Sequence, residues 1–351
     1  MGAGSVGAQE GRGTTRRVRV RVPAKINPFL SVRGRRADGY HDVVTVLQTV
    51  SLHDELEVLA PVTDAAAHPS TRRDVLLALE VLDGAAAPDP DLGPVGTVPV
   101  GPMGGLAGED NLAVRAARAL LDELAIPGGA FASDLGGRPD AVTRLRLTKR
   151  IPIAAGMAGG SADAAAALVA LDRVWGAELG RDRLQALAAR LGADVPFCVV
   201  GGTALATGTG TVTTQVLAGG RFHWVVGIDE APLSTAEVYA ARDELGPSDD
   251  VGPDRVLRAL RAGDVDLLGD ALHNDLEVAA LQLRPALVEG REALLAAGAV
   301  AAIVSGSGPT LLGLARDADD AHAIAARLTS GFARVEVVHS PAGGPELLAS
   351  S

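Results

Sequence analysis

The sequence predicts an α+β protein of two domains. Three observations lead to this prediction: the chain has 351 residues, its apolar residues recur with a strand period in some segments and a helix period in others, and a second series of strands starts at Phe222. A chain of this length can bury two separate cores. We expect an N-terminal domain over residues 18–218 and a C-terminal domain over residues 219–345. Residues 1–17 are rich in Gly, Ser, Thr and Arg without an apolar period, and they predict a disordered leader.

Strand and helix patterns follow one another in both domains. Val18, Val20 and Val22 alternate with arginines, which predicts a half-exposed first strand. The Gly- and Pro-rich residues 83–108 predict a long surface loop. Further N-terminal strands are expected over 55–59, 75–81, 143–148 and 197–206, and helices over 110–124, from Ser161 onward, and over 182–191. The C-terminal domain is expected to contain strands over 222–228, 301–304, 310–314 and 335–339, and helices over 235–245, 253–262, 283–297 and 317–328.

Composition and charge exclude several classes of protein. The formal net charge of −11 argues against nucleic acid as a partner, since nucleic-acid binders present a basic face. Cys198 is the only cysteine, so neither a disulfide framework nor a cysteine zinc site can form. The seven histidines form no paired metal motif. No apolar run reaches the roughly 20 residues that span a bilayer, and the N-terminus lacks a signal-peptide pattern, so we expect a cytoplasmic protein without a membrane partner.

Residues 152–161 form the most informative segment of the chain. Its members are Pro152, Ile153, Ala154, Ala155, Gly156, Met157, Ala158, Gly159, Gly160 and Ser161, and an alanine-rich helix pattern follows them. Small side chains let an anion approach the backbone, and the N–H groups at a helix N-terminus attract phosphate. We expect Ser161 to be the N-cap of this helix, with Asp163 in its first turn. The alternative is a tight turn before a closely packed helix, because the glycines fit neither of the two common nucleotide-binding fingerprints.

Three segments that contain glycine or proline together resemble the motifs of the GHMP kinases. They are Pro23–Asn27, residues 152–161 and Ser305–Thr310. A narrower similarity, to the members that phosphorylate a cytidine diphosphate ester of methylerythritol, rests on Gly34–His41, Glu109–Leu112, Gly192–Pro196 and His273–Glu277. The resemblance extends over about residues 18–340. It implies an N-terminal domain with a left-handed β-α-β unit, a C-terminal ferredoxin-like domain, and a site between the two.

The resemblance also implies an activity, namely transfer of the γ-phosphate of ATP to the 2-hydroxyl of that ester. By resemblance Asp194 is the catalytic base and Lys25 its cationic partner, and phosphoryl transfer does need a proton acceptor and positive charge. ATP would bind to Asn111 and to residues 152–161, with Mg²⁺ in contact with Ser161. The residues expected at the substrate are Asn27, Tyr40, His41, Thr235, Tyr239, Gly306 and Gly308. The implied partner is therefore a small cytidine diphosphate molecule, bound by a monomer or a weak homodimer.

Several of these residues also have simpler explanations. Asp194 stands in a segment flanked by Gly and Pro, where a turn or a helix end is common. Tyr239 also fits the buried face of its helix, and Gly306 and Gly308 fit a tight turn between strands. For the whole chain the alternatives are another GHMP kinase, acting on a sugar, homoserine or mevalonate, and a nucleotide-binding regulator without catalysis. The presence of both Lys25 and Asp194 argues against the regulator.

Three further expectations concern single positions. Ala155 and Ala158 stand where bacterial relatives commonly carry glycine. Alanine resists a positive φ, so either these residues have negative φ or ATP binding is weakened. For His273–Asp275 we expect helix capping rather than chemistry. Cys198 lies in an apolar run and is expected to be a buried, unreactive thiol.

Overall fold

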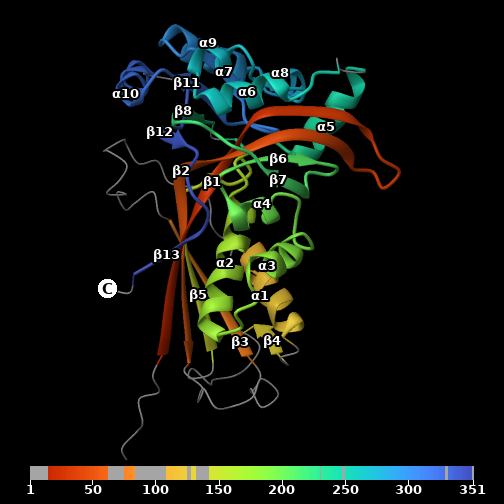
Figure 1. Cartoon of the computed structure of the whole chain (residues 1–351), viewed down its shortest axis with the longest axis vertical. Helices are drawn as coiled ribbons and strands as arrows, with labels where there is room; N and C mark the ends of the chain where they lie inside the picture. Colours follow the sequence, from red (N-terminus) through yellow and green to blue (C-terminus); the bar gives the residue numbers. More distant parts are fainter. Residues whose placement is uncertain are drawn as a thin grey trace, which may run out of the picture.

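Two β-sheets organise the chain, and each sheet belongs to one of the two predicted domains (Figure 1). This computed structural model describes residues 15–61, 75–83, 108–124, 128–131, 142–229, 231–246, 250–328 and 331–349. Helices and strands alternate along both halves of the chain. The α+β class is therefore confirmed.

A long antiparallel hairpin, made by β1 (Thr15–Arg35) and β2 (His41–Pro61), connects the two domains. In Figure 1 its strands run through the N-terminal domain and then curve beneath the C-terminal domain. The pairing register shifts at three places, two of which flank Lys25, and such irregularities bend a strand pair. The hairpin thereby carries Lys25 near its middle and His41 beside its turn.

The rest of the N-terminal domain combines a sheet with helices that pack on it. Its elements are β3 (Val75–Asp83), α1 (Leu112–Glu123), β4 (Gly128–Phe131), β5 (Val142–Lys149), α2 (Gly159–Trp175), α3 (Arg181–Ala188), α4 (Val195–Val200), β6 (Thr203–Thr207) and β7 (Val212–Gln215). β3 and β4 are parallel neighbours joined through α1, which makes the expected β-α-β unit. Its left-handed sense stays a prediction. α2 packs directly on β1 and β2.

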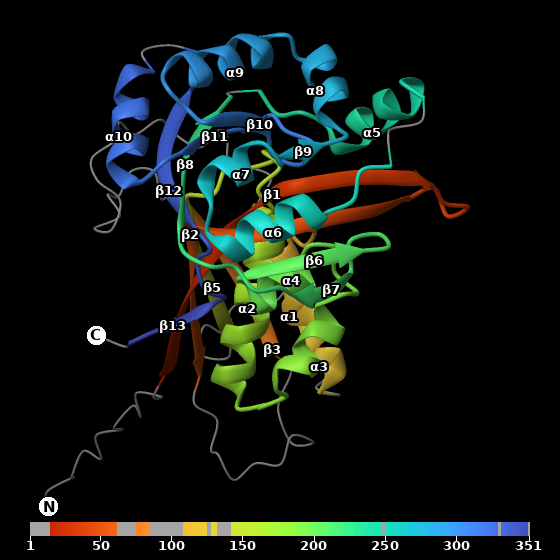
Figure 2. The same cartoon turned by 45° about the horizontal axis from the view of Figure 1, so that its top comes forward.

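The C-terminal sheet has the strand order of a ferredoxin-like domain. Its part of the chain contains β8 (Phe222–Ile228), α5 (Thr235–Glu244), α6 (Asp254–Ala262), α7 (Val265–Gly269), β9 (His273–Asn274), α8 (Glu277–Leu283), α9 (Ala286–Ala296), β10 (Ala301–Val304), β11 (Leu311–Ala315), α10 (Ala318–Arg327), β12 (Arg334–Ser340) and β13 (Glu346–Leu348). The order β10-β11-β8-β12, antiparallel throughout, is that of a β-α-β-β-α-β unit. Figure 2 shows α9 and α10 on the outer face of this sheet.

Two late segments of the chain return to the larger sheet. Its order is β13-β1-β2-β5-β3-β4, and β9 pairs with β1 while β6 pairs with β2 and β7. The expected boundary between residues 218 and 219 separates β7 from β8 and stays a prediction. Both β9 and β13 pair with β1. Strand β1 therefore connects the C-terminal part of the chain to the N-terminal domain.

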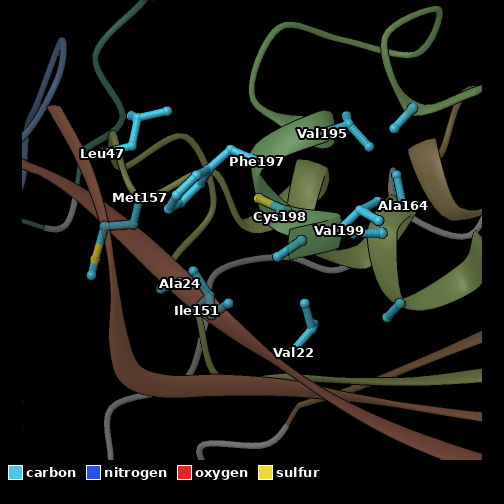
Figure 3. Packing of buried hydrophobic residues seen from close by; sticks show 14 of the residues in the cluster. Val22, Ala24, Leu47, Ile151, Met157, Ala164, Val195, Phe197, Cys198 and Val199 are labelled. Atoms are coloured by element: carbon cyan, nitrogen blue, oxygen red, sulfur yellow. The ribbon is translucent and has the colours of Figure 1, made fainter. Parts of the chain in front are cut away.

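The core beneath the hairpin is built from small and branched side chains. The alanines at positions 164–167 of α2 are fully buried, which lets the helix lie close to the strands. In Figure 3 Phe197 points toward Met157 and Leu47, and Cys198 lies beside it in the same cluster. Burial raises the pKa of the Cys198 thiol well above its usual value. The expectation of a buried cysteine is confirmed, and the raised pKa agrees with the prediction of an unreactive thiol.

Three sequence predictions about elements need correction. Residues 197–206 form the end of α4 and then β6, not one strand, because a short apolar run does not distinguish helix from strand. The helix expected over 283–297 is α9, which begins three residues later, after Pro285, while Leu283 is the last residue of α8, a separate helix that the sequence did not predict. Thr15–Arg17 already belong to β1, while the rest of the expected leader lies outside the described residues.

Residues 84–107 of the loop expected over 83–108 also lie outside the described residues. Within the part of the chain that is described, no helix combines the length and the hydropathy needed to cross a bilayer.

Candidate active site

The three motifs that resemble those of GHMP kinases meet beside Lys25. The Lys25 ammonium donates to the carbonyl oxygen of Gly156 in the second motif, at 3.0 Å. The third motif, residues 305–310, approaches from the C-terminal domain. A Cβ on Gly156, whose φ is +74°, would lie 2.1 Å from the Ser305 carbonyl oxygen, and one on Gly306 would lie 3.6 Å from Lys25 Nζ. Glycine at position 156 is thus what allows the two backbones to touch.

Lys25 and Asp194 form the charged pair at this point. Lys25 Nζ donates to Asn27 Oδ1 at 2.9 Å and lies 3.6 Å from Asp194 Oδ2. An ammonium group has three donors, so two neutral acceptors, on Asn27 and Gly156, leave one donor for Asp194 or for a ligand. Asp194 is the N-cap residue of α4, yet its side chain caps no helix N–H. The simpler explanation, that Asp194 occupies a turn or a helix end, therefore agrees with the position of its backbone. It gives no role to the carboxylate.

The helix that follows residues 152–161 begins earlier than the sequence predicts. α2 starts at Gly159 after the N-cap residue Ala158, so the prediction of Ser161 as N-cap is wrong and Ser161 lies inside the first turn. Glycine suits position 159 because a Cβ there would lie only 3.1 Å from Ile151 Cγ2. The first N–H groups of a helix have no intrahelical partner, and Ala158 offers no side-chain cap. Those of Gly159, Gly160 and Ser161 therefore form a positive end for an anion.

The three alanines of this loop differ in backbone geometry. Ala158 has φ +56°, and Ala154 has φ +51°, whereas Ala155 does not have a positive φ. We predict that Ala158→Gly raises the free energy of unfolding, because it relieves a left-handed alanine, and that Ala155→Gly lowers it by about 0.4 to 1 kcal/mol through unfolded-state entropy. Urea denaturation of both variants measures this difference. A loss of stability in both would contradict the geometry at Ala158.

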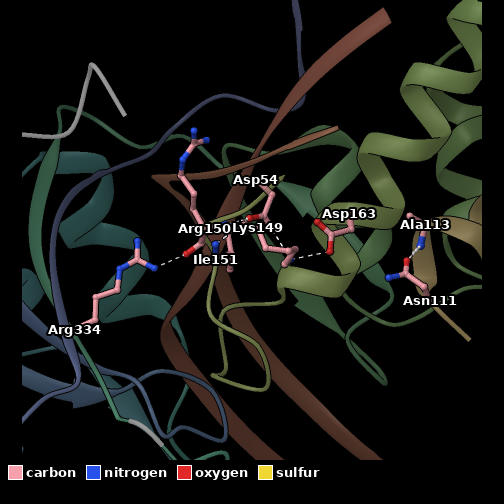
Figure 4. A network of polar contacts seen from close by, with 8 residues as sticks. All are labelled: Asp54, Asn111, Ala113, Lys149, Arg150, Ile151, Asp163 and Arg334. Carbon is pink, nitrogen blue, oxygen red and sulfur yellow. Dashed lines mark hydrogen bonds and ion pairs between the residues drawn. The ribbon is translucent and has the colours of Figure 1, made fainter. Parts of the chain in front are cut away.

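A buried ion network lies under the loop (Figure 4). Lys149, the last residue of β5, donates to Asp54 of β2 and, at 2.7 Å, to Asp163 of α2. The second oxygen of Asp54 accepts the backbone N–H groups of Arg150 (2.6 Å) and Ile151 (2.9 Å). The side chains of the three charged residues are almost completely buried. The network fixes β2, β5 and α2 to one another at the point where residues 152–161 begin.

This network was not predicted from the sequence, although the sequence contains a signal for it. Lys149 follows Leu145 and Leu147 at intervals of two, so it falls on the inward face of its strand. Burial raises the pKa of Asp163 well above its usual range, against the opposing charge of Lys149. Burial acts to lower the pKa of Lys149, but the charges of Asp54 and Asp163 outweigh it and the net change is upward. The cluster is thus an ammonium held between two carboxyl groups.

Beside the turn of the hairpin, His41 and Tyr239 form an aromatic pair. Their ring centroids are 4.8 Å apart, and His41 Nε2 lies 2.7 Å from Asp243 Oδ1 of α5, a partner that the sequence analysis missed. Burial, followed by the charge of Asp194, raises the pKa of Tyr239 to about 12. The Tyr239 phenol is therefore neutral near pH 7 and lies in the field of Asp194. Tyr40 precedes His41 on the turn and is 69% exposed.

The remaining residues expected at the substrate lie around the third motif. Thr235, the first residue of α5, is exposed, and its Oγ1 lies 2.9 Å from Ser307 Oγ. Gly306 and Gly308 have φ of +56° and +78°. Gly308 packs against Val304, whose Cγ1 would lie 3.1 Å from a Cβ at position 308. Both explanations of these glycines, a tight turn and a place beside the site, agree with the geometry.

Two asparagines expected to touch ligands also have structural partners. Asn27 is 2% exposed, and its Nδ2 donates to Thr45 Oγ1 at 2.9 Å while its Oδ1 accepts from Lys25. Asn27 thus orients the lysine. Asn111 is the N-cap of α1, and its Oδ1 accepts the N–H of Ala113 at 2.8 Å. The N-terminus of α1 lies beside that of α2, since a Cβ on Gly160 would lie 3.3 Å from Leu112 Cδ1.

Comparison with known proteins agrees with this geometry. Residues 111–202 match the model of the GHMP kinases N terminal domain, and residues 256–334 match that of the GHMP kinases C terminal domain. Two relatives named 4-diphosphocytidyl-2-C-methyl-D-erythritol kinase come from Leifsonia xyli subsp. xyli and Salinispora tropica. The first is 42% identical over 94% of this chain and 98% of its own, and the second is 43% identical over 96% of each.

Solved structures give the same result. A crystal structure of 4-(cytidine 5'-diphospho)-2C-methyl-D-erythritol kinase is 32% identical, with a TM-score of 0.66 over 94% of this chain and 100% of that chain. A homoserine kinase from Cytophaga hutchinsonii is 16% identical, with a TM-score of 0.64 over 98% of this chain and 100% of that chain, and it shows the fold alone. The chain therefore belongs to the GHMP kinase family, in the group of its 4-diphosphocytidyl-2-C-methyl-D-erythritol kinase relatives.

Proposed function

We propose that the chain transfers the γ-phosphate of ATP to the 2-hydroxyl of 4-diphosphocytidyl-2-C-methyl-D-erythritol. The observation that supports this most directly is the convergence of two half-sites on Lys25 and Asp194. Gly156, within residues 152–161, accepts from Lys25, and Tyr239, which pairs with the His41 ring, is close enough to Asp194 for that charge to raise its pKa. The first half-site suits a triphosphate, and the second suits a pyrimidine. Relatives of that name match nearly the whole chain.

Residues 152–161 suit the phosphates of ATP, because they lead into the uncapped N-terminus of α2. Asn111, at the neighbouring helix N-terminus, would border the nucleotide. Mg²⁺ bound with ATP would neutralise charge on the β- and γ-phosphates. The described residues contain no group of three or more acidic, histidine or cysteine side chains able to hold a metal, and Mg²⁺ is often held by few protein ligands. The Ser161 hydroxyl, a hard oxygen donor in the first turn of α2, would hold it, since Asp163 is bonded to Lys149.

Asp194 and Lys25 suit the transfer itself. Asp194 would accept the proton of the attacking hydroxyl as the new O–P bond forms and the bond to the β-phosphate oxygen breaks. ADP leaves with that electron pair. The free donor of Lys25 would stabilise the negative charge on the reacting oxygens, and its burial strengthens this interaction.

His41 and Tyr239 suit the cytosine. The two rings offer a flat face, and His41 Nδ1 offers a polar edge because Nε2 is held by Asp243. Tyr40 and Thr235 would complete the site from the hairpin turn and from the start of α5. Recognition of the base would thus come from residues outside the ATP loop.

We predict that His41→Ala raises KM for the cytidine-bearing substrate about 10- to 100-fold and leaves KM for ATP unchanged, because loss of a buried hydrogen bond costs about 1 to 3 kcal/mol. Steady-state kinetics with each substrate varied in turn measures both constants. The control is His223→Ala on β8. This change also removes an imidazole ring from an aromatic pair, the one with His339 in the C-terminal sheet. An equal rise in both KM values for the His41 variant would contradict the assignment.

A coupled ADP-release assay across alcohols with and without a cytidine diphosphate group tests the proposed function. Free methylerythritol phosphate should be a very poor acceptor. Equal turnover with and without the cytidine group would overturn the proposal and favour a sugar, homoserine or mevalonate kinase. The cytoplasmic location and the monomeric or weakly dimeric state are part of the same proposal, and light scattering after size-exclusion chromatography measures the latter.

A further inference from the structure

The segment His273–Asp275 connects the two domains at a place that the proposed reaction leaves unexplained. β9 follows α7 of the C-terminal domain, yet it pairs in parallel with β1, the strand that carries Lys25. The N–H of Asp275 donates to the Leu30 carbonyl oxygen at 2.9 Å. Its Oδ2 accepts the Val32 N–H at 2.7 Å. These contacts fix the segment on the N-terminal domain.

Asn274 extends this connection to the third motif. Its Nδ2 donates to the carbonyl oxygens of Val304 (2.9 Å) and Gly306 (2.8 Å), and its Oδ1 accepts the N–H of Leu276 (3.0 Å). The last bond closes an Asx turn and is not a helix cap, because the N-cap of α8 is Leu276 and no side chain caps that helix. The prediction of helix capping by this segment is therefore wrong. The residue is 7% exposed. One buried amide therefore holds the two carbonyl groups that flank Ser305.

The position of Gly306 matters for the charged pair. A Cβ on Gly306 would lie 3.3 Å from Asn27 Oδ1 and 3.6 Å from Lys25 Nζ. The backbone of the third motif thus forms one wall around the ammonium group. Any shift of Gly306 changes the space in which Lys25 and a phosphate oxygen have to meet.

We propose that Asn274 is a positioning residue for phosphoryl transfer, because its amide holds Gly306 against Lys25 and Asn27. This inference rests on the proposed kinase function. Asparagine suits the place because its planar amide supplies two donors, one to each carbonyl oxygen. A carboxylate of the same shape would direct an oxygen at both carbonyl oxygens and would push the loop away.

The test is Asn274→Asp, which keeps the size of the side chain. We expect kcat to fall about 10- to 100-fold per folded enzyme, with KM for ATP nearly unchanged, because small displacements at a reacting group cost rates of this order. Burial favours the protonated form of the introduced carboxyl, and its O–H can donate to one carbonyl oxygen. The ratio of variant to wild-type kcat should therefore rise severalfold from pH 8 to pH 6. The titratable groups around it, which are Lys25, His273, Asp275 and Glu277, are the same in both proteins, so the ratio isolates the new carboxyl.

The matched control is Asp275→Asn. This variant alters the bond between the Asp275 side chain and the Val32 N–H, in the same segment. It leaves the bonds from Asn274 to the third motif in place. It should lower the melting temperature while kcat stays near the wild-type value. If both variants lose kcat in proportion to their loss of stability, Asn274 is only structural and the proposal is wrong.

A second variant, Asn274→Ser, covers the case in which the aspartate variant does not fold. It should lose kcat without a change in pH dependence, since it introduces no titratable group. Normal kcat in whichever variant folds would overturn the positioning role. All variants are assayed with the acceptor that the wild-type enzyme turns over fastest. If the wild-type enzyme prefers an acceptor without cytidine, the proposed function is refuted. The role of Asn274 is still decided in that case, by the ratio of variant to wild-type kcat with the preferred acceptor.

Discussion

Replacing Asp194 with asparagine should lower kcat about 100- to 10,000-fold, the usual cost of losing a general base. The binding of ATP should change little, because the phosphates are assigned to residues 152–161 and to the N-terminus of α2. The fold should also survive, since the Asp194 side chain caps no helix N–H and a third of it is exposed. Lys25 keeps its two neutral acceptors in the variant. Single-turnover kinetics together with nucleotide titration separates the two effects.

The matched control for this variant is Asp264→Asn. Asp264 is also a helix N-cap, at the start of α7, and its side chain does accept a helix N–H, from Leu267 at 2.9 Å. This change should reduce stability slightly and leave kcat as it is. If Asp194→Asn turned over substrate at nearly the wild-type rate, Asp194 would not be the catalytic base. Its role would then be that of a residue in a turn at the start of α4.

Much of this site follows from local sequence. The small residues between Pro152 and Ser161 predict an exposed backbone before a helix, and the structure has that helix. The alternation around Val20 predicts β1. What local sequence did not predict is the residue at which the helix starts. Gly159 is a poor helix former in isolation, and the reason for glycine there is long-range, because a Cβ at position 159 would crowd Ile151 and Lys149.

Contacts between distant segments could not be predicted from the sequence. His41 and Asp243 are 202 positions apart, and no pattern within either segment relates them. Asn274 looks like a capping residue when only its neighbours are considered, and its bonds to the third motif depend on how β9 is placed against β1. Such pairings are set by the packing of whole elements. The residues whose roles were missed are accordingly those that position other residues.

The buried ion network predicts a large effect on stability. Lys149→Met leaves Asp54 and Asp163 buried without their cation, and removing one partner of a buried ion pair costs about 3 to 5 kcal/mol. Urea denaturation monitored by far-UV circular dichroism measures the loss. The matched control is Arg146→Met on the outward face of the same strand, where the arginine pairs with Glu57 and Glu80. Because the Arg146 side chain is about half exposed and Glu57 keeps its second ion pair, with Arg17, this loss should change stability little.

The loss of stability in the Lys149→Met variant should also depend on pH. Whether it grows or shrinks as pH rises follows from the pKa of Asp163. The pKa of Asp163 is raised in the folded protein even with Lys149 present, and removal of the cation raises it further. The folded state then keeps a proton that the unfolded chain releases above about pH 4, so stability falls as pH rises through that range and up to the folded pKa. The variant should therefore lose more stability at pH 8 than at pH 5. Asp163→Asn, which keeps the pair of Lys149 and Asp54, should lose far less at pH 8. Equal losses for the two variants at pH 8 would show that the ammonium group does not hold this network together.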